Sequence, residues 1–139
     1  MKKSTSISKI MTTDVITLSN KDDLSTAELL FKTHRIRHIP VIKEETVVGI
    51  LSYTDLLRIS FADAVYEDEE TVDTIVYNMF TIEQVMAKNL VSVTSETSIK
   101  EVAEILSKKE FHALPVIDDS KLVGIVTSTD LINYLLEQF

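Results

Sequence analysis

The chain has 139 residues, of which 45% are apolar, and a formal net charge of −8. This composition is typical of a globular protein with a buried core, and the negative charge disfavours nucleic acid as the main partner, because such partners are bound by a basic face. The absence of cysteine excludes disulfides, thiolate nucleophiles and cysteine-ligated zinc. No signal peptide is recognised and no apolar run reaches the roughly 20 residues of a membrane helix, so we expect a cytoplasmic protein without membrane contact.

The sequence contains an internal repeat. Residues 6–57 align without a gap on residues 81–132 when the numbering is shifted by 75, and eleven aligned positions are identical. Every proline and every glycine of the chain is among them: Pro40, Gly49, Pro115 and Gly124. Because these residue types interrupt regular structure and are scarce here, their pairing indicates two copies of one folding unit.

Each copy begins with the same two predicted elements. A short first strand is expected at 14–18 and at 89–93. An amphipathic helix follows, because apolar residues recur on one helix face: Leu24, Ala27, Leu30 and Phe31 in the first copy, and Ile99, Val102, Ala103 and Leu106 in the second.

Two more strands and a closing helix complete each copy. The second strand is expected at 39–42 and 114–117, where a proline is tolerated near the start. After a polar turn, the third strand covers 47–51 and 122–126, and its nearly continuous apolar character indicates cover on both faces. The closing helix is expected to begin near a threonine, Thr54 or Thr129.

The fold class is therefore α/β, with two β-α-β-β-α repeats. A single copy of about fifty residues buries little core by itself, so we expect the copies to pack around a pseudo-twofold axis. The expected domains are a first repeat at 6–57, a helical linker at 58–80, and a second repeat with a C-terminal helix at 81–139.

The linker carries an apolar helix face and an acidic run. Val72, Ile75, Val76 and Met79 predict the helix. The acidic residues 67–70 are interpreted as a solvated helix entrance or loop. A divalent-ion site is the less favoured alternative, because nothing nearby fixes a coordination geometry.

A hydroxyl and a carboxylate recur where the third strand meets the closing helix: Ser52 with Asp55, and Thr127 with Asp130. One interpretation is a capping box at a helix start. The other is a nucleotide site, because a helix N-terminus after a strand suits an anion and a carboxylate accepts hydrogen bonds from a ribose diol. The preceding glycine would let another backbone or a ligand approach closely.

Basic residues cluster at 34–38, before the second strand of the first copy. They either interact with the C-terminal dipole of the helix or recognise phosphate, for which Arg37 and His38 are the candidates. The second copy has only His112 there. A metal held by His34 and His38 is a minor alternative, since the following proline should end the helix.

The paired motifs resemble the CBS-domain family, named after cystathionine β-synthase, in which two such repeats form a Bateman module. The matching stretches are HIPVI (38–42) with GILSYTDLL (49–57), and ALPVI (113–117) with GIVTSTDLI (124–132). The resemblance extends over about 6–57 and 81–132, and both motifs recur in order and at one spacing.

The resemblance implies a regulatory module that binds AMP, ADP, ATP or S-adenosylmethionine, with or without Mg²⁺, in the cleft between repeats. Asp55 and Asp130 would hold ribose hydroxyls, and Ser52 and Thr127 would meet phosphate. Further residues would flank the adenine: Val15, Ile16, Ile39, Leu90, Val91 and Leu114. No tightly bound cofactor is implied, and such modules often form homodimers.

We therefore expect a stand-alone module that senses an adenosine compound and modulates an effector protein. The alternative is an oligomerisation scaffold with no nucleotide ligand, in which the apolar linker and the C-terminal helix (Leu131, Ile132, Leu135 and Leu136) mediate assembly. An enzyme is disfavoured, because the sequence offers no nucleophile–base pair and no phosphate-binding glycine loop.

Overall fold

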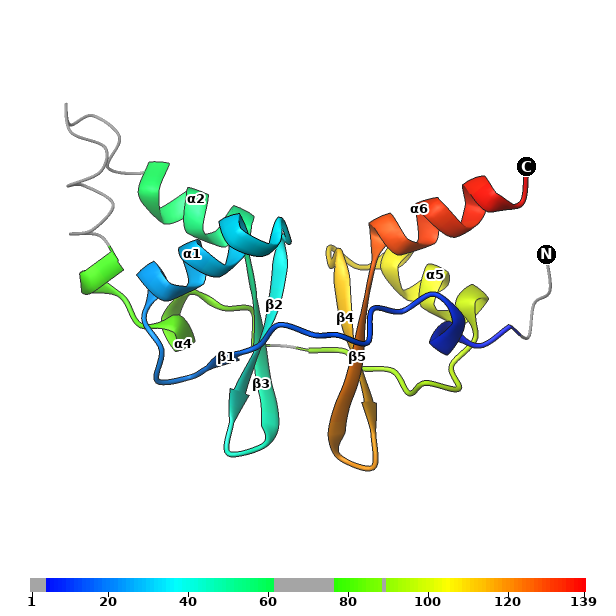
Figure 1. The fold of residues 1–139 in the computed structure, drawn as a ribbon, viewed down its shortest axis with the longest axis horizontal. Coiled ribbons are helices and arrows are strands. Elements are labelled where there is room, and N and C mark those ends of the chain that lie inside the picture. The colour runs from blue at the N-terminus through cyan, green and yellow to red at the C-terminus, as the bar shows by residue number, and fades with distance from the viewer. Residues whose placement is uncertain (1–4, 62–76, 89) are drawn as a thin grey trace. The chain divides into compact units, whose positions relative to one another are not determined.

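A computed structural model describes residues 5–61, 77–88 and 90–139 of the chain. They form two compact units. The first-repeat unit comprises Ile16–Leu90, and the second-repeat unit combines Met1–Val15 with Val91–Phe139. Figure 1 shows the elements of both units.

The first-repeat unit is a three-stranded sheet covered by helices. Its strands are β1 (Leu18–Ser19), β2 (His38–Lys43) and β3 (Thr46–Ser52), in the order β1-β2-β3. β1 is parallel to β2, and β2 is antiparallel to β3. Its helices are α1 (Leu24–His34), α2 (Tyr53–Phe61) and α4 (Ile82–Val85).

The second-repeat unit repeats the hairpin and its helices. β4 (Ala113–Asp118) pairs antiparallel with β5 (Lys121–Thr127), and Val93 alone bridges in parallel to Val116. The helices are α5 (Ile99–Lys108), α6 (Ser128–Glu137) and a short 3-10 helix, η1 (Ile7–Lys9).

Local signals explain where the helices begin and end. The Asp23 side chain accepts a hydrogen bond from the Thr26 amide at 2.8 Å and caps α1, and Ser98 caps α5 in the same way. α1 ends at Arg35, whose φ of 54° lies in the left-handed region. The predicted first helices, hairpins and closing helices are thereby confirmed.

The predicted first strands are wrong in extent. Of residues 14–18 only Leu18 belongs to β1, and of the described residues 90–93 only Val93 makes a bridge. The physical reason is that the chain passes from one unit to the other at 15–16 and at 90–91, so these stretches have no continuous partner strand. The acidic run 67–70 and most of the predicted linker helix lie outside the described residues.

Each unit has its own apolar core. The first contains Leu24, Phe31, Ile39, Val41 and Leu51, and the second contains Val102, Leu114, Val116 and Val126. At the edge of the first core, the buried Tyr77 donates a hydrogen bond to Glu28, which also pairs with Lys32 at 3.0 Å. Residues just after the undescribed segment are thereby attached to α1.

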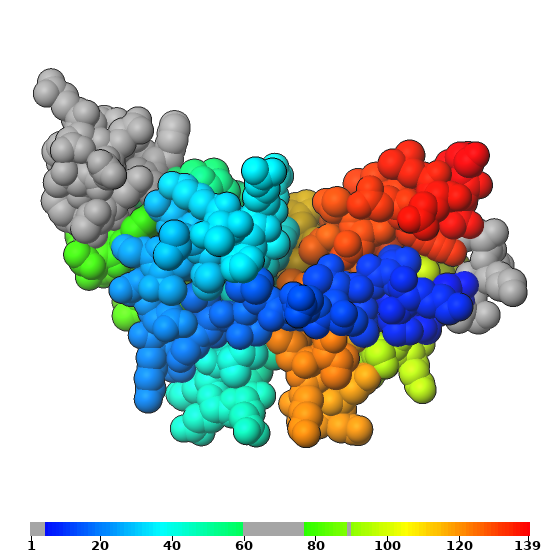
Figure 2. Space-filling view, in the orientation of Figure 1, coloured from blue at the N-terminus to red at the C-terminus, as the bar shows by residue number. Residues whose placement is uncertain are grey.

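The first residues of each repeat, its leading segment, pack in the other unit. Ile7 is buried in the second-repeat core, and Ile82 and Met86 are buried in the first. In Figure 2, the N-terminal atoms (blue) lie against the C-terminal part of the chain (orange and red). The compact units therefore differ from the sequence repeats by an exchange of their leading segments.

Both glycines lie where these leading segments cross a hairpin. Thr12 exchanges backbone hydrogen bonds of 2.8 and 2.9 Å with Ile125, beside Gly124. Ala87 does the same with Ile50, at 2.9 and 3.1 Å, beside Gly49. The prediction that glycine admits a close backbone is confirmed, and no positive φ is involved.

Candidate functional site

The first junction, Ser52–Asp55, lies where β3 runs directly into α2. The Asp55 amide donates to Ser52 Oγ at 3.0 Å, and the Ser52 amide donates to Asp55 Oδ2 at 3.0 Å. These reciprocal hydrogen bonds form a capping box, so the structural interpretation of this pair is confirmed.

The second junction, Thr127–Asp130, has the same geometry at the start of α6. The Asp130 amide donates to Thr127 Oγ1 at 3.2 Å, and the Thr127 amide donates to Asp130 Oδ2 at 2.9 Å. The two junctions are therefore equivalent in structure as well as in sequence.

Each capping box leaves hydrogen-bonding capacity for a ligand. The hydroxyl only accepts a bond within the box, so its own proton stays available, and the carboxylate uses only Oδ2 within the box. The remaining oxygen, Oδ1, accepts from Arg58 at 3.4 Å in Asp55 and lies outside the box in Asp130. All four side chains are half-buried rather than enclosed. A capping role and a binding role are therefore compatible at both junctions.

Arg58 is the residue that distinguishes the first junction. Its Nη1 lies 3.4 Å from Asp55 Oδ1, three positions along α2. The arginine side chain is 74% exposed and the aspartate side chain 18% exposed. An exposed pair of this kind is weak, so a ligand can displace it. The sequence contained the signal, an i,i+3 spacing of opposite charges, but it did not place Arg58 at the site.

Most of the first amides of α2 and α6 have hydrogen-bond partners within the fold. The Tyr53 amide donates to the Arg37 carbonyl at 2.8 Å, and the Ser128 amide donates to the His112 carbonyl at 3.0 Å. Together with the capping boxes, this leaves only the amides of Thr54 and Thr129 unpartnered among the first amides of the described α2 and α6. The Arg37 and His112 carbonyls and the two capping boxes account for the other first amides.

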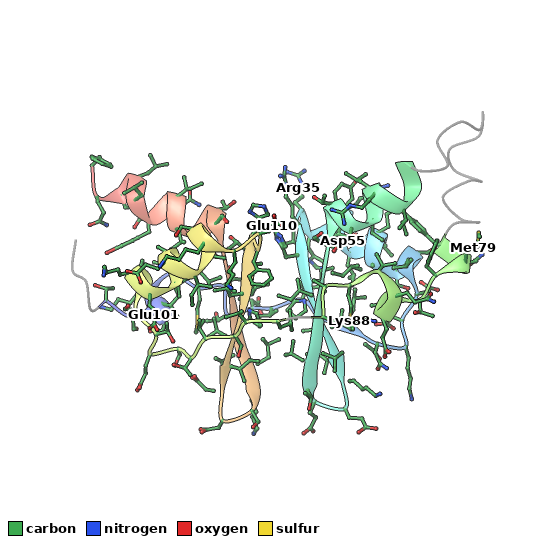
Figure 3. All side chains as sticks on the ribbon, turned by 180° about the vertical axis from the view of Figure 1, so that it is seen from behind. Arg35, Asp55, Met79, Lys88, Glu101 and Glu110 are labelled. Carbon is green, nitrogen blue, oxygen red and sulfur yellow. The ribbon has the colours of Figure 1, made fainter. Side chains whose placement is uncertain are left out.

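The same contacts bring the basic residues to the junctions. His38 lies opposite Ser52 in the β2–β3 ladder, and Arg37 adjoins the first turn of α2. In the second-repeat unit, Ala113 lies opposite Thr127, and His112 adjoins α6. Figure 3 shows Arg35 and Asp55 at the same end of the first-repeat unit.

The remaining predicted ligand contacts are apolar residues outside the capping boxes. Ile39 and Leu114 are 0% and 1% exposed and belong to the cores, so packing alone accounts for them. Four predicted contacts are half-buried beside the points where the chain changes unit, namely Val15, Ile16, Leu90 and Val91. The role of all six beside adenine stays a prediction.

The structure does not place His34 and His38 in the helical geometry on which the metal-site alternative depended. His34 is the last residue of α1, whereas His38 begins β2 after a left-handed cap, so the two do not lie on one helix turn. Within residues 5–61, 77–88 and 90–139, no group of three or more potential ligand side chains is placed to hold a metal ion.

The CBS domain family model matches residues 7–62 and 82–137. The two matches cover most of the chain and follow the two sequence repeats, each with one hairpin and its closing helix. The chain therefore belongs to the CBS-domain family, and the resemblance seen in the sequence is confirmed.

Two curated proteins are similar over most of this chain. Protein MJ1225 of Methanocaldococcus jannaschii is 26% identical over 92% of this chain and 46% of that protein, so the chain spans about half its length. CBS domain-containing protein YhcV of Bacillus subtilis is 29% identical over 91% of this chain and 82% of YhcV. None of the described helices is long and apolar enough to cross a membrane.

A solved structure matches nearly end to end. The CBS domain pair of protein MJ0100, crystallised in complex with 5′-methylthioadenosine and S-adenosyl-L-methionine, is 26% identical to this chain with a TM-score of 0.81. The match covers 97% of this chain and 98% of that one.

Proposed function

We propose that this chain is a regulatory CBS-domain module that binds an adenosine compound at its two junctions and thereby modulates an effector protein in the cytoplasm. The observation that carries the proposal is that both capping boxes leave a hydroxyl proton and a carboxylate Oδ1 outside the box, with only the exposed Arg58 on Oδ1 of Asp55. The adenosine ligands of the MJ0100 pair support this ligand class. The chain acts by binding rather than by catalysis.

The residues suit the two polar parts of such a ligand. A carboxylate oxygen of Asp55 or Asp130 accepts hydrogen bonds from ribose hydroxyls. The hydroxyls of Ser52 and Thr127 donate to a phosphate or to a substituent in its place. The candidate ligands are AMP, ADP, ATP and S-adenosylmethionine, with Mg²⁺ accompanying a polyphosphate.

Control of a partner follows from differential affinity. A ligand shifts an equilibrium between two states only as far as it binds one state more tightly than the other. Within the module, the aspartates proposed to bind the ligand, Asp55 and Asp130, lie in the first turn of α2 and of α6. A bound ligand therefore stabilises α2 and α6 at their N-termini, and the effector is expected to bind the stabilised form.

A second candidate function is assembly without a nucleotide. Its support is the exposed apolar surface of the last helix and the residues after it: Ile132, Leu135, Leu136 and Phe139. Such surface is a candidate for protein contact, and we propose that it forms a homodimer under either function. Under the assembly function, the junction residues serve as caps only.

Thermal melting with AMP, ADP, ATP and S-adenosylmethionine, each with and without Mg²⁺, tests the binding function. A ligand at a hundredfold excess over its Kd adds roughly 2.7 kcal/mol to the unfolding free energy, which is several degrees in Tm for a chain of this size. A saturable shift that Asp55→Ala or Asp130→Ala reduces supports the proposal. Unchanged melting with every compound contradicts it and leaves the assembly function.

A further inference from the structure

We propose that the two junctions take different classes of adenosine compound. The first junction takes a phosphorylated compound, and the second takes a nucleoside that carries no phosphate. This inference rests on the proposed function, because it assigns ligands to the same two junctions. It comes from comparing side chains that the fold places equivalently in the two units.

The equivalence of the positions is structural. One hydrogen bond, from the first amide of the closing helix, fixes the backbone of Arg37 in the first unit and of His112 in the second. The strand registers place His38 opposite Ser52 and Ala113 opposite Thr127. A difference in side chain at these positions is therefore a difference in the chemistry beside the junction.

At three equivalent positions the first-repeat unit has a positively charged arginine and the second-repeat unit does not. The three arginines of the chain all belong to the first-repeat unit: Arg35, Arg37 and Arg58. The second-repeat unit has other residues at the corresponding positions: Glu110, His112 and Asn133. All six are exposed and so available to a ligand. Guanidinium groups bind phosphate through paired hydrogen bonds, which an acid, an imidazole and an amide at these positions do not reproduce.

The two aspartates reinforce this difference. Arg58 lies 3.4 Å from Asp55 and offsets its negative charge, so a phosphate can approach the first junction without net repulsion. At the second junction, Asn133 replaces that arginine, and no cation pairs with Asp130 within the described part of the chain. The unpaired carboxylate still accepts ribose hydroxyls, but it repels a phosphate.

Isothermal titration with ADP and with adenosine tests the assignment. Arg37→His/Arg58→Asn gives the first junction the side chains of the second, and we expect ADP affinity to fall about tenfold or more, as for lost hydrogen bonds to a charged group. Adenosine should lose much less. The reciprocal His112→Arg/Asn133→Arg should add a second, saturable ADP site. The exchanged positions are exposed and outside the capping boxes, so the fold is retained, as melting without ligand would verify.

Lys43→Gln is the matched control. It removes one positive charge from the same β2–β3 hairpin, but at the opposite end from the first junction. ADP affinity should therefore stay that of the unaltered chain.

Two results would overturn the inference. If ADP affinity is unaffected by Arg37→His/Arg58→Asn, or if ADP and adenosine weaken equally, the junctions do not divide ligands by phosphate, although the proposed function stands. If the unaltered chain binds neither compound, the proposed function itself fails, and the division of ligands fails with it.

Discussion

The carbonyl oxygen of Thr12 lies 3.0 Å from the point that a Cβ atom would occupy on Gly124. The Ala87 carbonyl oxygen has the same relation to Gly49, at 2.9 Å. In each unit a backbone, and not a flexible side chain alone, therefore fills the space beside the glycine.

Gly49→Ala and Gly124→Ala should each destabilise the protein by about 1–3 kcal/mol, because the added methyl group overpacks against a hydrogen-bonded carbonyl. Chemical denaturation measures the loss. Thr46→Ala, at an exposed position of the same strand as Gly49, should change the unfolding free energy by less than about 0.5 kcal/mol. A stabilised Gly→Ala variant would show that the crossing backbone has room to move.

The second capping box should behave as a coupled pair. Thr127→Ala and Asp130→Ala should each cost about 1 kcal/mol, because each leaves one amide of the α6 start without its partner. The double variant should cost less than the sum, since the residues share one motif. Thr129→Ala, an exposed neighbour outside the box, is the control. Strictly additive losses in a denaturant-based cycle would argue against reciprocal capping.

Asp118 should contribute to acid sensitivity. Hydrogen bonds from the Ser95 hydroxyl and from the Ser95 amide lower the pKa of Asp118 below its ordinary value. Because the folded pKa is lower than the unfolded one, the contribution is complete above the unfolded value of about 3.9 and is lost as pH falls through the folded pKa.

Asp118→Asn should therefore flatten the dependence of unfolding free energy on pH below about 4. Denaturation at a series of pH values between neutral and strongly acidic measures it. Glu137→Gln, on the exposed end of α6, provides the comparison. If the unfolding free energy of Asp118→Asn falls as steeply below pH 4 as that of the unaltered chain, this carboxylate does not contribute to acid sensitivity.

The turn of the β2–β3 hairpin is a place where stability can be gained. Glu44 and Glu45 have φ values of 52° and 85°, a conformation that asparagine and glycine adopt more readily. Glu44→Asn/Glu45→Gly should raise the unfolding free energy by roughly 0.5–2 kcal/mol. Asp119→Asn/Ser120→Gly, in the other hairpin, should gain less, because aspartate already tolerates this conformation. Equal or no gains, seen by thermal melting, would contradict this account.

Local sequence patterns were sufficient to predict the helices and hairpins. They did not predict that the leading segments of the two repeats are exchanged between the units. Asp23 and Pro40 act on their immediate neighbours, so capping and strand starts were predictable. The glycines indicated a close approach, but not which segment makes it. Ile7 and Ile82 are the same residue type at the same position of the two repeats. Because the sequence does not distinguish the two cores for these residues, the exchange was not predictable from it.

The sequence predicted the residues of the candidate site, but not the hydrogen-bond partners that the fold gives them. The spacing of Ser52 and Asp55 alone predicted a cap, which the structure confirms, and a ligand contact, which stays a prediction. The Arg37 carbonyl, however, reaches the Tyr53 amide only through the fold, because fifteen intervening residues form a hairpin. The contact between Arg37 and Tyr53 and the position of Arg58 therefore required the structure.

The exchanged leading segments also determine the order in which the two units can fold during synthesis. A ribosome adds roughly 5–20 residues per second, so Thr12 waits on the order of ten seconds before Ile125 has been made. Until then Ile7 has no core to enter, although the first-repeat unit can close once residue 90 has been translated. Pulsed labelling of nascent chains would therefore find the first-repeat unit protected while the N-terminal residues are still open to exchange.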